Sequence, residues 1–324
     1  MDVQLLPWRD GRSNLCARWK GGGHMVMSGH MDTVPAPADG WSADPFGGAV
    51  RNGRLLGRGA SDMKGGLAAM VSAAVEAALA DSPPFTLVVT SAEETGCQGA
   101  TALRTLRALP EDPILIVGEA TGNRVLFGHK GVVWLSVRAS GRAAHASRPE
   151  LGTNAILGLA RAVVALEDLR SSAHPRLGRS TVSVGTIHGG AQTNLVPDHA
   201  HMDVDVRTVT NRDAAAVIAT IEQVTGPGTA TTTLDLPAIW TDPASSLSAR
   251  VQGIVHDMTG QASRPMAAAY FTDAAVLANR VAPRVYVVGP GALDSPHTTN
   301  EDCSVEAIRT AQRIYRELLT RLAS

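Results

Sequence analysis

Four short apolar runs in this 324-residue chain each lead, directly or through a turn, into an acid or a histidine. They occupy residues 24–29, 85–90, 114–117 and 285–288. Near-continuous apolar strands of this kind are typical of a sheet that is covered on both faces. The sequence therefore predicts four buried strands, each followed by a residue that carries chemistry.

Helical patterns lie between these strands, at residues 66–80, 100–109 and 304–322. Alternating strands and helices favour a doubly wound α/β layer. In such folds ligands bind beyond the carboxyl ends of the strands. We therefore expect the polar residues that follow the four strands to gather at one edge of one sheet.

The middle of the chain has a different pattern. Strands are expected at residues 132–139, 181–187, 201–209 and 231–236, with a helix at 152–169 and a second helix opening near Asn211. Asn211 or Asp213 is the expected cap of that second helix. The order strand-helix-strand-strand-helix-strand is the ferredoxin-like split unit. The length suits two domains, so we expect an α/β domain over 1–128 and 239–324 and an inserted α+β domain over 129–238.

Composition argues against several classes of function. The formal net charge is −1 without large blocks of either sign, which does not favour a nucleic-acid or polybasic membrane surface. Apolar runs do not reach the roughly 18 to 20 residues of a membrane span, and the N-terminus lacks a signal-peptide pattern. Cys16, Cys97 and Cys303 are odd in number and widely spaced, unlike a disulfide framework. A cytoplasmic enzyme is the expectation.

His30 and Asp32 follow the first strand within the segment SGHMDTVP, residues 28–35. Residues two apart at a strand end point to the same side. A carboxylate beside an imidazole can hold its second N–H and leave the other nitrogen for a metal. A surface histidine beside a turn-forming aspartate explains the pair equally well.

Asp62 stands in a glycine-flanked loop, GRGASDMKGG at 57–66, just before a helix. The loop superficially suggests a phosphate site, but it does not match the pattern GxxxxGK[ST], because Lys64 is not followed by Ser or Thr. A carboxylate that bridges two cations would suit such a tight loop.

Two adjacent glutamates, Glu93 and Glu94, follow the second strand. Such a pair at a buried strand end is unfavourable unless cations accompany it, and one glutamate can bind metal while its neighbour handles a proton. Glu119 ends the third strand, and His297 lies in DSPHTTNED at 294–302. Each residue alone could be an ordinary loop residue. Together, imidazoles and carboxylates suit zinc, manganese or cobalt, and a metal pair can polarise a carbonyl and generate hydroxide.

These motifs resemble those of the dinuclear-zinc family of acetylornithine deacetylases, succinyl-diaminopimelate desuccinylases, aminoacylases and glutamate carboxypeptidases. The resemblance runs over nearly the whole chain. It implies two divalent metal ions, zinc first with cobalt or manganese as alternatives. The implied ligands are His30 and Glu119 for one metal, Glu94 and His297 for the other, and Asp62 as the bridge.

The resemblance also assigns roles beside the metals. Asp32 would orient His30, and Glu93 would be the general base that takes a proton from the bridging water. The peptide bond after Asp62 would be cis. The family usually has a helix before the first strand, where this chain has only about two dozen residues, so the core could lack a covering helix.

The inserted domain resembles the family's lid and dimerisation domain. The segment GRAAHAS at 141–147 resembles a lid segment whose histidine, here His145, crosses a dimer interface to steady the oxyanion. The segments GGAQTN and DVDVR resemble those that hold the substrate carboxylate, which implies roles for Asn194 and Arg207. The planar fork of an arginine matches a carboxylate, although a surface ion pair would explain Arg207 and a plain loop role would explain His145. We therefore expect a homodimer joined through this domain.

The expected activity is hydrolysis of the amide bond of an N-acyl amino acid. The segments HKG at 129–131 and IHGG at 187–190 look more like acetylornithine deacetylases than like other branches. A dipeptidase or glutamate-type carboxypeptidase is the alternative within the same chemistry. A metal-free binding homologue would have lost a ligand or the base, and a nucleotide-binding protein would need the phosphate-loop pattern that is missing here.

Overall fold

The computed structural model describes residues 1–9, 11–37, 39–262 and 264–322. It divides into two compact units. The first contains Met1–His129, Ile239–Ala268 and Thr272–Ser324, and the second contains Lys130–Ala238 and Ala269–Phe271. The expected domains differ from these units at His129 and at residues 269–271, which lie far from the inserted segment in sequence.

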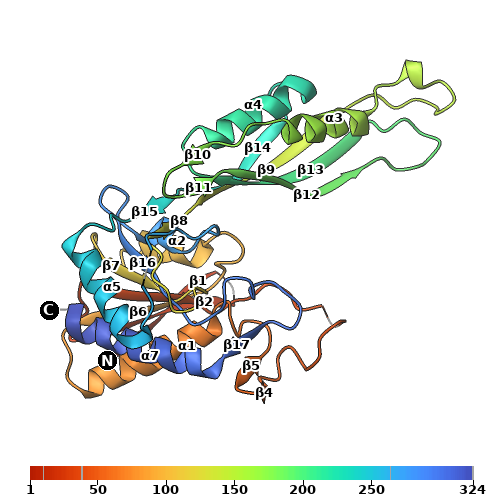
Figure 1. The fold of residues 1–324 in the computed structure, drawn as a ribbon. Helices are drawn as coiled ribbons and strands as arrows, with labels where there is room; N and C mark the ends of the chain where they lie inside the picture. The colour runs from red at the N-terminus through yellow and green to blue at the C-terminus, as the bar shows by residue number, and fades with distance from the viewer. Residues whose placement is uncertain (10, 38, 263, 323–324) are drawn as a thin grey trace. The chain divides into compact units, whose positions relative to one another are not determined.

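A six-stranded sheet forms the centre of the first unit (Figure 1). Its order is β1 (Asp2–Arg9), β2 (Arg12–Trp19), β6 (Phe85–Thr90), β3 (Met25–His30), β7 (Ile114–Val117) and β16 (Arg284–Val287). The four strands expected from apolar runs are β3, β6, β7 and β16. They run parallel to their neighbours in this group, so their carboxyl ends share one edge of the sheet.

The residues before β3 form a hairpin that extends this sheet. Strands β1 and β2 are antiparallel, and β2 pairs antiparallel with β6. The apolar pattern of the sequence did not predict these two strands. Every side chain of β1 is exposed or half-buried, so this edge strand lacks the continuous apolar run that marks the central strands.

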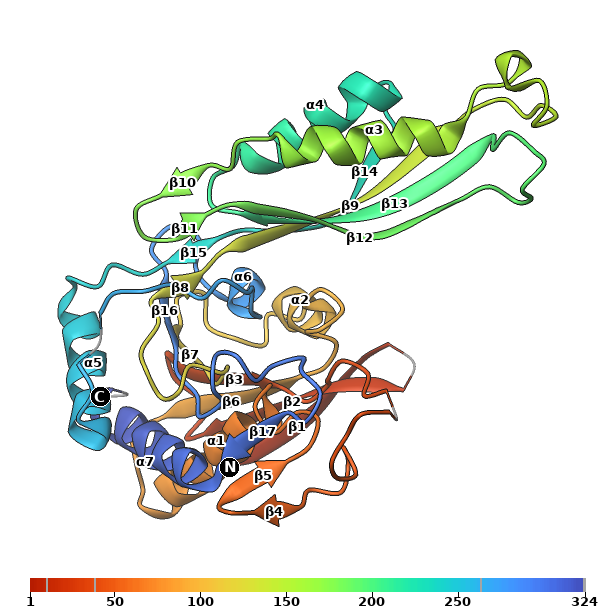
Figure 2. The same cartoon turned by 45° about the vertical axis from the view of Figure 1, so that its right-hand side comes forward.

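Helices cover both faces of the sheet. Helices α1 (Lys64–Leu79) and α7 (Val305–Leu322) pack together on one face, and α2 (Gln98–Thr105) and α6 (Ala274–Leu277) contact each other on the other (Figure 2). Helix α5 (Ser246–Thr259) packs against α7 and was not foreseen. Apart from Met70, the buried stripe of α1 consists of small residues such as Ala69, Ala73 and Ala77, against which the bulky buried face of α7 packs.

The second unit is a four-stranded antiparallel sheet with two helices, as expected for a ferredoxin-like unit. The sheet order is β12 (Thr181–Gly189), β13 (His199–Thr208), β9 (Gly131–Ser140) and β14 (Ala230–Leu236). Helix α3 (Ala155–Glu167) follows β9, and helix α4 (Asp213–Thr225) follows β13.

The prediction that Asn211 or Asp213 caps α4 was wrong. Arg212 occupies the cap position and makes no side-chain cap bond. Asp213 is the first helical residue, and its carboxylate accepts the backbone N–H groups of Val209 and Thr210 in the preceding turn. Its acceptor oxygens are therefore used to hold the end of β13 instead of the first turn of the helix.

The remaining short elements are β4 (Val50–Arg51), β5 (Arg54–Leu56), β8 (Gly128–His129), a 3₁₀ turn (Pro149–Leu151), β10 (Ala173–His174), β11 (Gly178–Arg179), β15 (Ile239–Trp240) and β17 (Asp302–Ser304). These short strands form three small sheets, β10 with β11, β15 with β8, and β17 with β5 and β4. None of the helices among the described residues has the length and apolarity that a membrane-spanning segment requires.

Candidate metal centre

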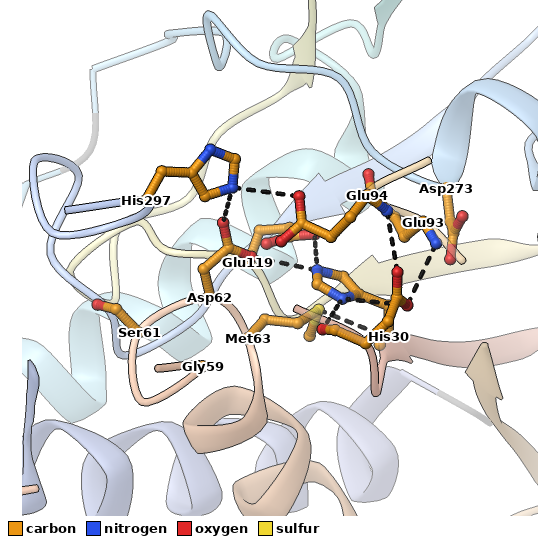
Figure 3. A network of polar contacts seen from close by, with 12 residues as sticks. His30, Gly59, Ser61, Asp62, Met63, Glu93, Glu94, Glu119, Asp273 and His297 are labelled. Atoms are coloured by element: carbon orange, nitrogen blue, oxygen red, sulfur yellow. Dashed lines mark hydrogen bonds and ion pairs between the residues drawn. The ribbon is translucent and has the colours of Figure 1, made fainter. Parts of the chain in front are cut away.

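Five segments meet at the carboxyl edge of the parallel strands. His30 is the last residue of β3, and Glu94 and Glu119 follow β6 and β7 in the chain. Asp62 precedes α1, and His297 lies between β16 and β17. Because the strands are parallel neighbours, residues far apart in sequence reach the same place (Figure 3).

The carboxylate of Asp62 lies between two imidazoles. Its Oδ1 atom is 3.1 Å from Nε2 of His30, and its Oδ2 atom is 3.3 Å from Nε2 of His297. One oxygen therefore faces each ring (Figure 3). The Asp62–Met63 peptide bond is cis, as the resemblance implied.

Each imidazole also faces a glutamate. Nε2 of His30 is 3.4 Å from Oε1 of Glu119, and Nε2 of His297 is 3.1 Å from Oε2 of Glu94. The five residues thus form two sets that share Asp62. The structure brings together all five of the ligands that the sequence suggested.

These atoms fit a pair of divalent cations. Ligand atoms bound about 2.0–2.1 Å from one tetrahedral zinc ion lie about 3.3 Å apart, close to the separations found within each set. Oε1 of Glu94 is buried and has no hydrogen-bond partner among the described residues. Ligand atoms of His30, Asp62 and Glu94 all lie within 4.8 Å of one another. Such a set of imidazoles and carboxylates is suited to zinc and related metals.

The histidines of the site are surrounded by carboxylates. Burial would lower the pKa of His30, but the charge of Glu119 and a hydrogen bond with Asp62 raise it well above its usual value. Hydrogen bonds with Asp62 and Glu94 raise the pKa of His297 to about 10. Burial acts to raise the pKa of Asp62, but its hydrogen bonds with His297 and His30 bring the pKa below its usual range.

The pKa values of two glutamates at the site are also shifted from their usual range. Burial, with the nearby charge of Asp62, raises the pKa of Glu119 to about 8. Burial also raises the pKa of Glu93 well above its usual value. Carboxylates that hold protons this strongly mark a place that needs positive charge, which metal cations supply when they replace the protons.

Asp32 lies beside both His30 and the two glutamates. Nδ1 of His30 is 3.0 Å from the backbone carbonyl oxygen of Asp32 and 3.7 Å from its Oδ1. The carboxylate itself accepts the backbone N–H groups of Glu93 and Glu94. The nearest partner of the His30 ring at Nδ1 is thus the carbonyl of Asp32, where the resemblance suggested an orienting role for this residue.

Glu93 is buried near a second carboxylate, Asp273, which sequence reasoning missed. Asp273 accepts the hydroxyl hydrogen bond of Thr90, and Sγ of Cys97 lies 3.9 Å from Oε1 of Glu93. Asp273 belongs to a stretch without a recognised motif, so only its burial in the folded chain points to it. Glu301 was also missed, although it stands four residues after His297.

In the second unit, the segments of His145 and Asn194 lie side by side. His145 bridges to Leu195, and the carbonyl oxygen of Asn194 accepts the N–H of Ala146 at 3.0 Å. Nδ1 of His145 is 2.7 Å from Oγ of Ser147. Both His145 and Asn194 are exposed, which leaves them accessible to a ligand.

Arg207 makes an ion pair within its own strand. Its Nε and Nη2 atoms donate to the two oxygens of Asp205 at 2.7 and 3.0 Å. The guanidinium also lies over the ring of Phe271, 5.2 Å from the ring centre. This pairing is the surface ion pair that the sequence left open as the alternative for Arg207.

Comparison with known proteins shows a family match over most of the chain. The model of Peptidase family M20/M25/M40 matches residues 26–321. A probable succinyl-diaminopimelate desuccinylase of Staphylococcus epidermidis is 33% identical over 279 residues, covering 76% of this chain and 69% of the relative. An acetylornithine deacetylase of Edwardsiella ictaluri is 28% identical over 334 residues, covering 98% and 86%.

Solved structures share the fold. A metallo-carboxypeptidase of the M20 family from Sulfolobus solfataricus superimposes with a TM-score of 0.81 at 17% identity, over 99% of this chain and 90% of the other. A dinuclear metal-binding peptidase of the M20 family from Bacillus subtilis gives a TM-score of 0.70 at 15% identity, over 99% and 88%. The chain therefore belongs to Peptidase family M20/M25/M40, a family of hydrolases.

Proposed function

We propose that this protein hydrolyses the amide bond of an N-acyl amino acid, with two divalent metal ions and Glu93 as the general base. The position of Asp62 is the observation that carries this proposal. Its two oxygens face two different imidazoles at 3.1 and 3.3 Å. A carboxylate placed in this way can serve two cations at once.

Each metal has its own ligands in this proposal. His30 and Glu119 would hold one metal, His297 and Glu94 the other, and Asp62 would serve both. Zinc is the proposed metal, with cobalt or manganese as alternatives. When bound, such a pair polarises a carbonyl and lowers the pKa of water.

Glu93 is proposed to move the proton. Burial raises the pKa of Glu93, which makes its ionised carboxylate a stronger proton acceptor. It would take a proton from the attacking water and pass it to the amide nitrogen as the C–N bond breaks. The products would be the free carboxylic acid and the free amine. Proton transfer by a positioned side chain is worth about 10²–10⁴-fold in rate.

The second unit is proposed as the lid and dimerisation domain, corresponding to the inserted segment 129–238. His145 would steady the oxyanion in the active site of a partner subunit. Asn194 and Arg207 would hold the carboxylate of the substrate. For Arg207 this requires that a substrate carboxylate share or displace Asp205, because Asp205 already accepts from the guanidinium edge.

The relatives with substantial sequence identity support deacylation over peptide cleavage. Their names describe desuccinylation and deacetylation, in which a small acyl group leaves an amino acid. A dipeptidase or a glutamate-type carboxypeptidase would use the same metal centre on a different substrate.

A metal analysis paired with a substrate panel tests this proposal. Elemental analysis by inductively coupled plasma mass spectrometry should find two metal ions per chain in the purified protein. It should release free amine from acetyl- or succinyl-amino acids faster than from dipeptides and C-terminal glutamate peptides. Preference for the dipeptides would replace deacylation by peptidase activity, and a fully active protein without metal would overturn the proposal.

A further inference from the structure

We propose that Glu301 is a positioning residue that fixes Asp62 relative to His297. The proposal rests on the proposed function, because it concerns the carboxylate that serves both metals. Glu301 does not contact the ligand atoms itself. It acts through the backbone of the loop 57–62 that carries Asp62.

The carboxylate of Glu301 is the hydrogen-bond centre of that loop. Its Oε1 atom accepts the backbone N–H groups of Ser61 and Asp62 at 2.8 and 2.9 Å. Its Oε2 atom accepts the N–H of Gly59 at 3.0 Å and the guanidinium of Arg58 at 2.7 Å. One side chain therefore holds three N–H groups of the loop, including that of Asp62 itself.

The loop has a backbone shape that turns its N–H groups inward. Gly57 and Gly59 have φ angles of 145° and 85°, which side chains rarely adopt. A Cβ atom at Gly59 would lie 2.7 Å from the methyl group of Thr33, and one at Gly57 would lie 2.8 Å from the carbonyl oxygen of Pro45. Successive inward N–H groups form a concave site for an anion, and Glu301 fills it.

The same residue belongs to the segment that carries His297. On one side of Glu301, Asn300 accepts the N–H of Ser42 at 2.6 Å. On the other side, Asp302 pairs with Leu56 in the β17–β5 ladder. The carbonyl of Glu301 also accepts the N–H of Gly57 at 2.9 Å. The chain after His297 is thus attached directly to the loop of Asp62 by Glu301, while Asp302 holds the strand that leads into this loop and Asn300 holds the more distant segment at Ser42.

The buried charge of Glu301 matters for this role. Its side chain is completely buried, and that of its partner Arg58 is 4% exposed. Arg58 also lies over the ring of Trp41, 5.2 Å from the ring centre. A buried carboxylate needs such partners, and a neutral side chain at position 301 cannot provide the same acceptors.

Glu301→Gln is the sharpest variant, since it keeps the size of the side chain. The amide NH₂ group cannot accept a hydrogen bond. It must face either the N–H groups of Ser61 and Asp62 or the donors of Gly59 and Arg58. Two hydrogen bonds are lost in either orientation. Asp302→Asn is the matched control, because Asp302 is the next residue and pairs with Arg54 through its side chain, away from the loop of Asp62.

The experiment measures zinc affinity by competition with a chelator, together with the melting temperature of the metal-free protein. Glu301→Gln is expected to bind zinc about 10–100-fold more weakly, the usual effect of losing an outer-shell partner. Asp302→Asn should retain wild-type affinity. In zinc-saturated protein, Glu301→Gln should lower kcat while KM changes little, because the substrate contacts remain.

A purely structural role would lower the melting temperature without changing zinc affinity. A folded Glu301→Gln protein that binds both metals as tightly as the wild type would therefore overturn the inference and leave the proposed function intact. A wild-type protein that fails to bind two metals would overturn both. If Glu301→Gln does not fold, Glu301→Asp replaces it. That variant keeps the charge but is one methylene too short to reach the loop, and the same loss of affinity is expected.

Discussion

The carboxylate of Asp32 accepts a hydrogen bond of 3.1 Å from the backbone N–H of Glu94. Its other oxygen accepts the N–H of Glu93 at 3.2 Å. The backbone carbonyl of the same residue lies 3.0 Å from Nδ1 of His30. Asp32 thus has two separate effects. Its main chain favours the tautomer of His30 that leaves Nε2 for a metal, and its side chain holds the turn that presents both glutamates.

Replacement of Asp32 separates these effects. Asp32→Ala keeps the carbonyl at His30 but removes both acceptors for the glutamate turn, so zinc affinity is expected to fall by about 10–100-fold. Asp32→Asn keeps one acceptor oxygen, so its zinc affinity should lie between that of Asp32→Ala and that of the wild type. Chelator competition measures both variants. Wild-type affinity in Asp32→Ala would mean that the carbonyl alone is sufficient and that the turn holds itself.

Glu93→Ala tests the general base. The side chain is outside the two sets of ligand atoms, so metal content should remain near two ions per chain. Turnover should fall by at least the 10²–10⁴-fold that proton transfer contributes. Elemental analysis and steady-state kinetics on the same sample check both parts. Retained turnover would place the base elsewhere, and Asp273, a buried carboxylate whose charge acts on Glu93, would be the next residue to replace.

Removal of metal should destabilise the first unit as well as inactivate the protein. A ligand that binds only the folded state adds about 2.7 kcal/mol at a concentration 100 times its Kd. Dialysis against a chelator should therefore lower the melting temperature, and added zinc should restore both stability and activity. His297→Ala, which keeps one complete set of ligands, should recover less of the stability. An equal melting temperature with and without metal would contradict the expected site.

Asp213 predicts a pH dependence of stability in the second unit. Burial acts to raise its pKa, but hydrogen bonds from Ser172 and from the backbone of Val209 and Thr210 bring the pKa below its usual value. A carboxylate with a lowered folded pKa stabilises the fold above its unfolded pKa of about 3.9, and this stability is lost as pH falls through the folded pKa.

The measurement compares the wild type with Asp213→Asn in urea unfolding followed by circular dichroism. The variant should lose about 1.5–3 kcal/mol at neutral pH, the range for hydrogen bonds to a charged group. The difference between the two proteins should shrink as pH falls below about 3.9, where the unfolded carboxylate takes up its proton, and should disappear once pH is below the lowered pKa of the folded carboxylate. A difference that is constant with pH would show that the charge of Asp213 is unimportant.

The sequence was most informative where burial is continuous. Strands β3, β6, β7 and β16 are buried on both faces and were recognisable from their apolar runs. The β1–β2 hairpin was overlooked, although Asp10-Gly11 between its strands is a hairpin signal. Its first strand lies at the sheet edge and carries few buried side chains. Helix α5 was not predicted, because only Ser248, Val251, Ile254 and Val255 of its 14 residues are buried and its apolar pattern is short.

Four of the proposed metal ligands, His30, Glu94, Glu119 and His297, could be found because each stands at or after the end of a strand that the pattern predicts, and Asp62 was found from its glycine-flanked loop before a helix. Glu301 and Asp273 could not, since their partners are brought to them only by folding. The N–H groups that bind Glu301 stand about 240 positions earlier in the chain. Arg207 illustrates the opposite case. The segment DVDVR contains both its expected substrate role and its actual partner Asp205, and the sequence could not choose between them.

The homodimer and the role of His145 are tested together by complementation. In this proposal each active site combines Glu93 of one chain with His145 of the other. Glu93→Ala and His145→Ala proteins should each be nearly inactive, because loss of one oxyanion donor costs about 10²–10³-fold in related chemistry. Mixed under conditions of subunit exchange, half of the dimers would be hybrids, and each hybrid would contain one site with both groups intact. Activity should then return to about a quarter of the wild-type value for random mixing of a two-fold dimer. If exchange is verified with labelled subunits and activity stays at the level of the separate variants, His145 does not serve the site of a neighbouring chain.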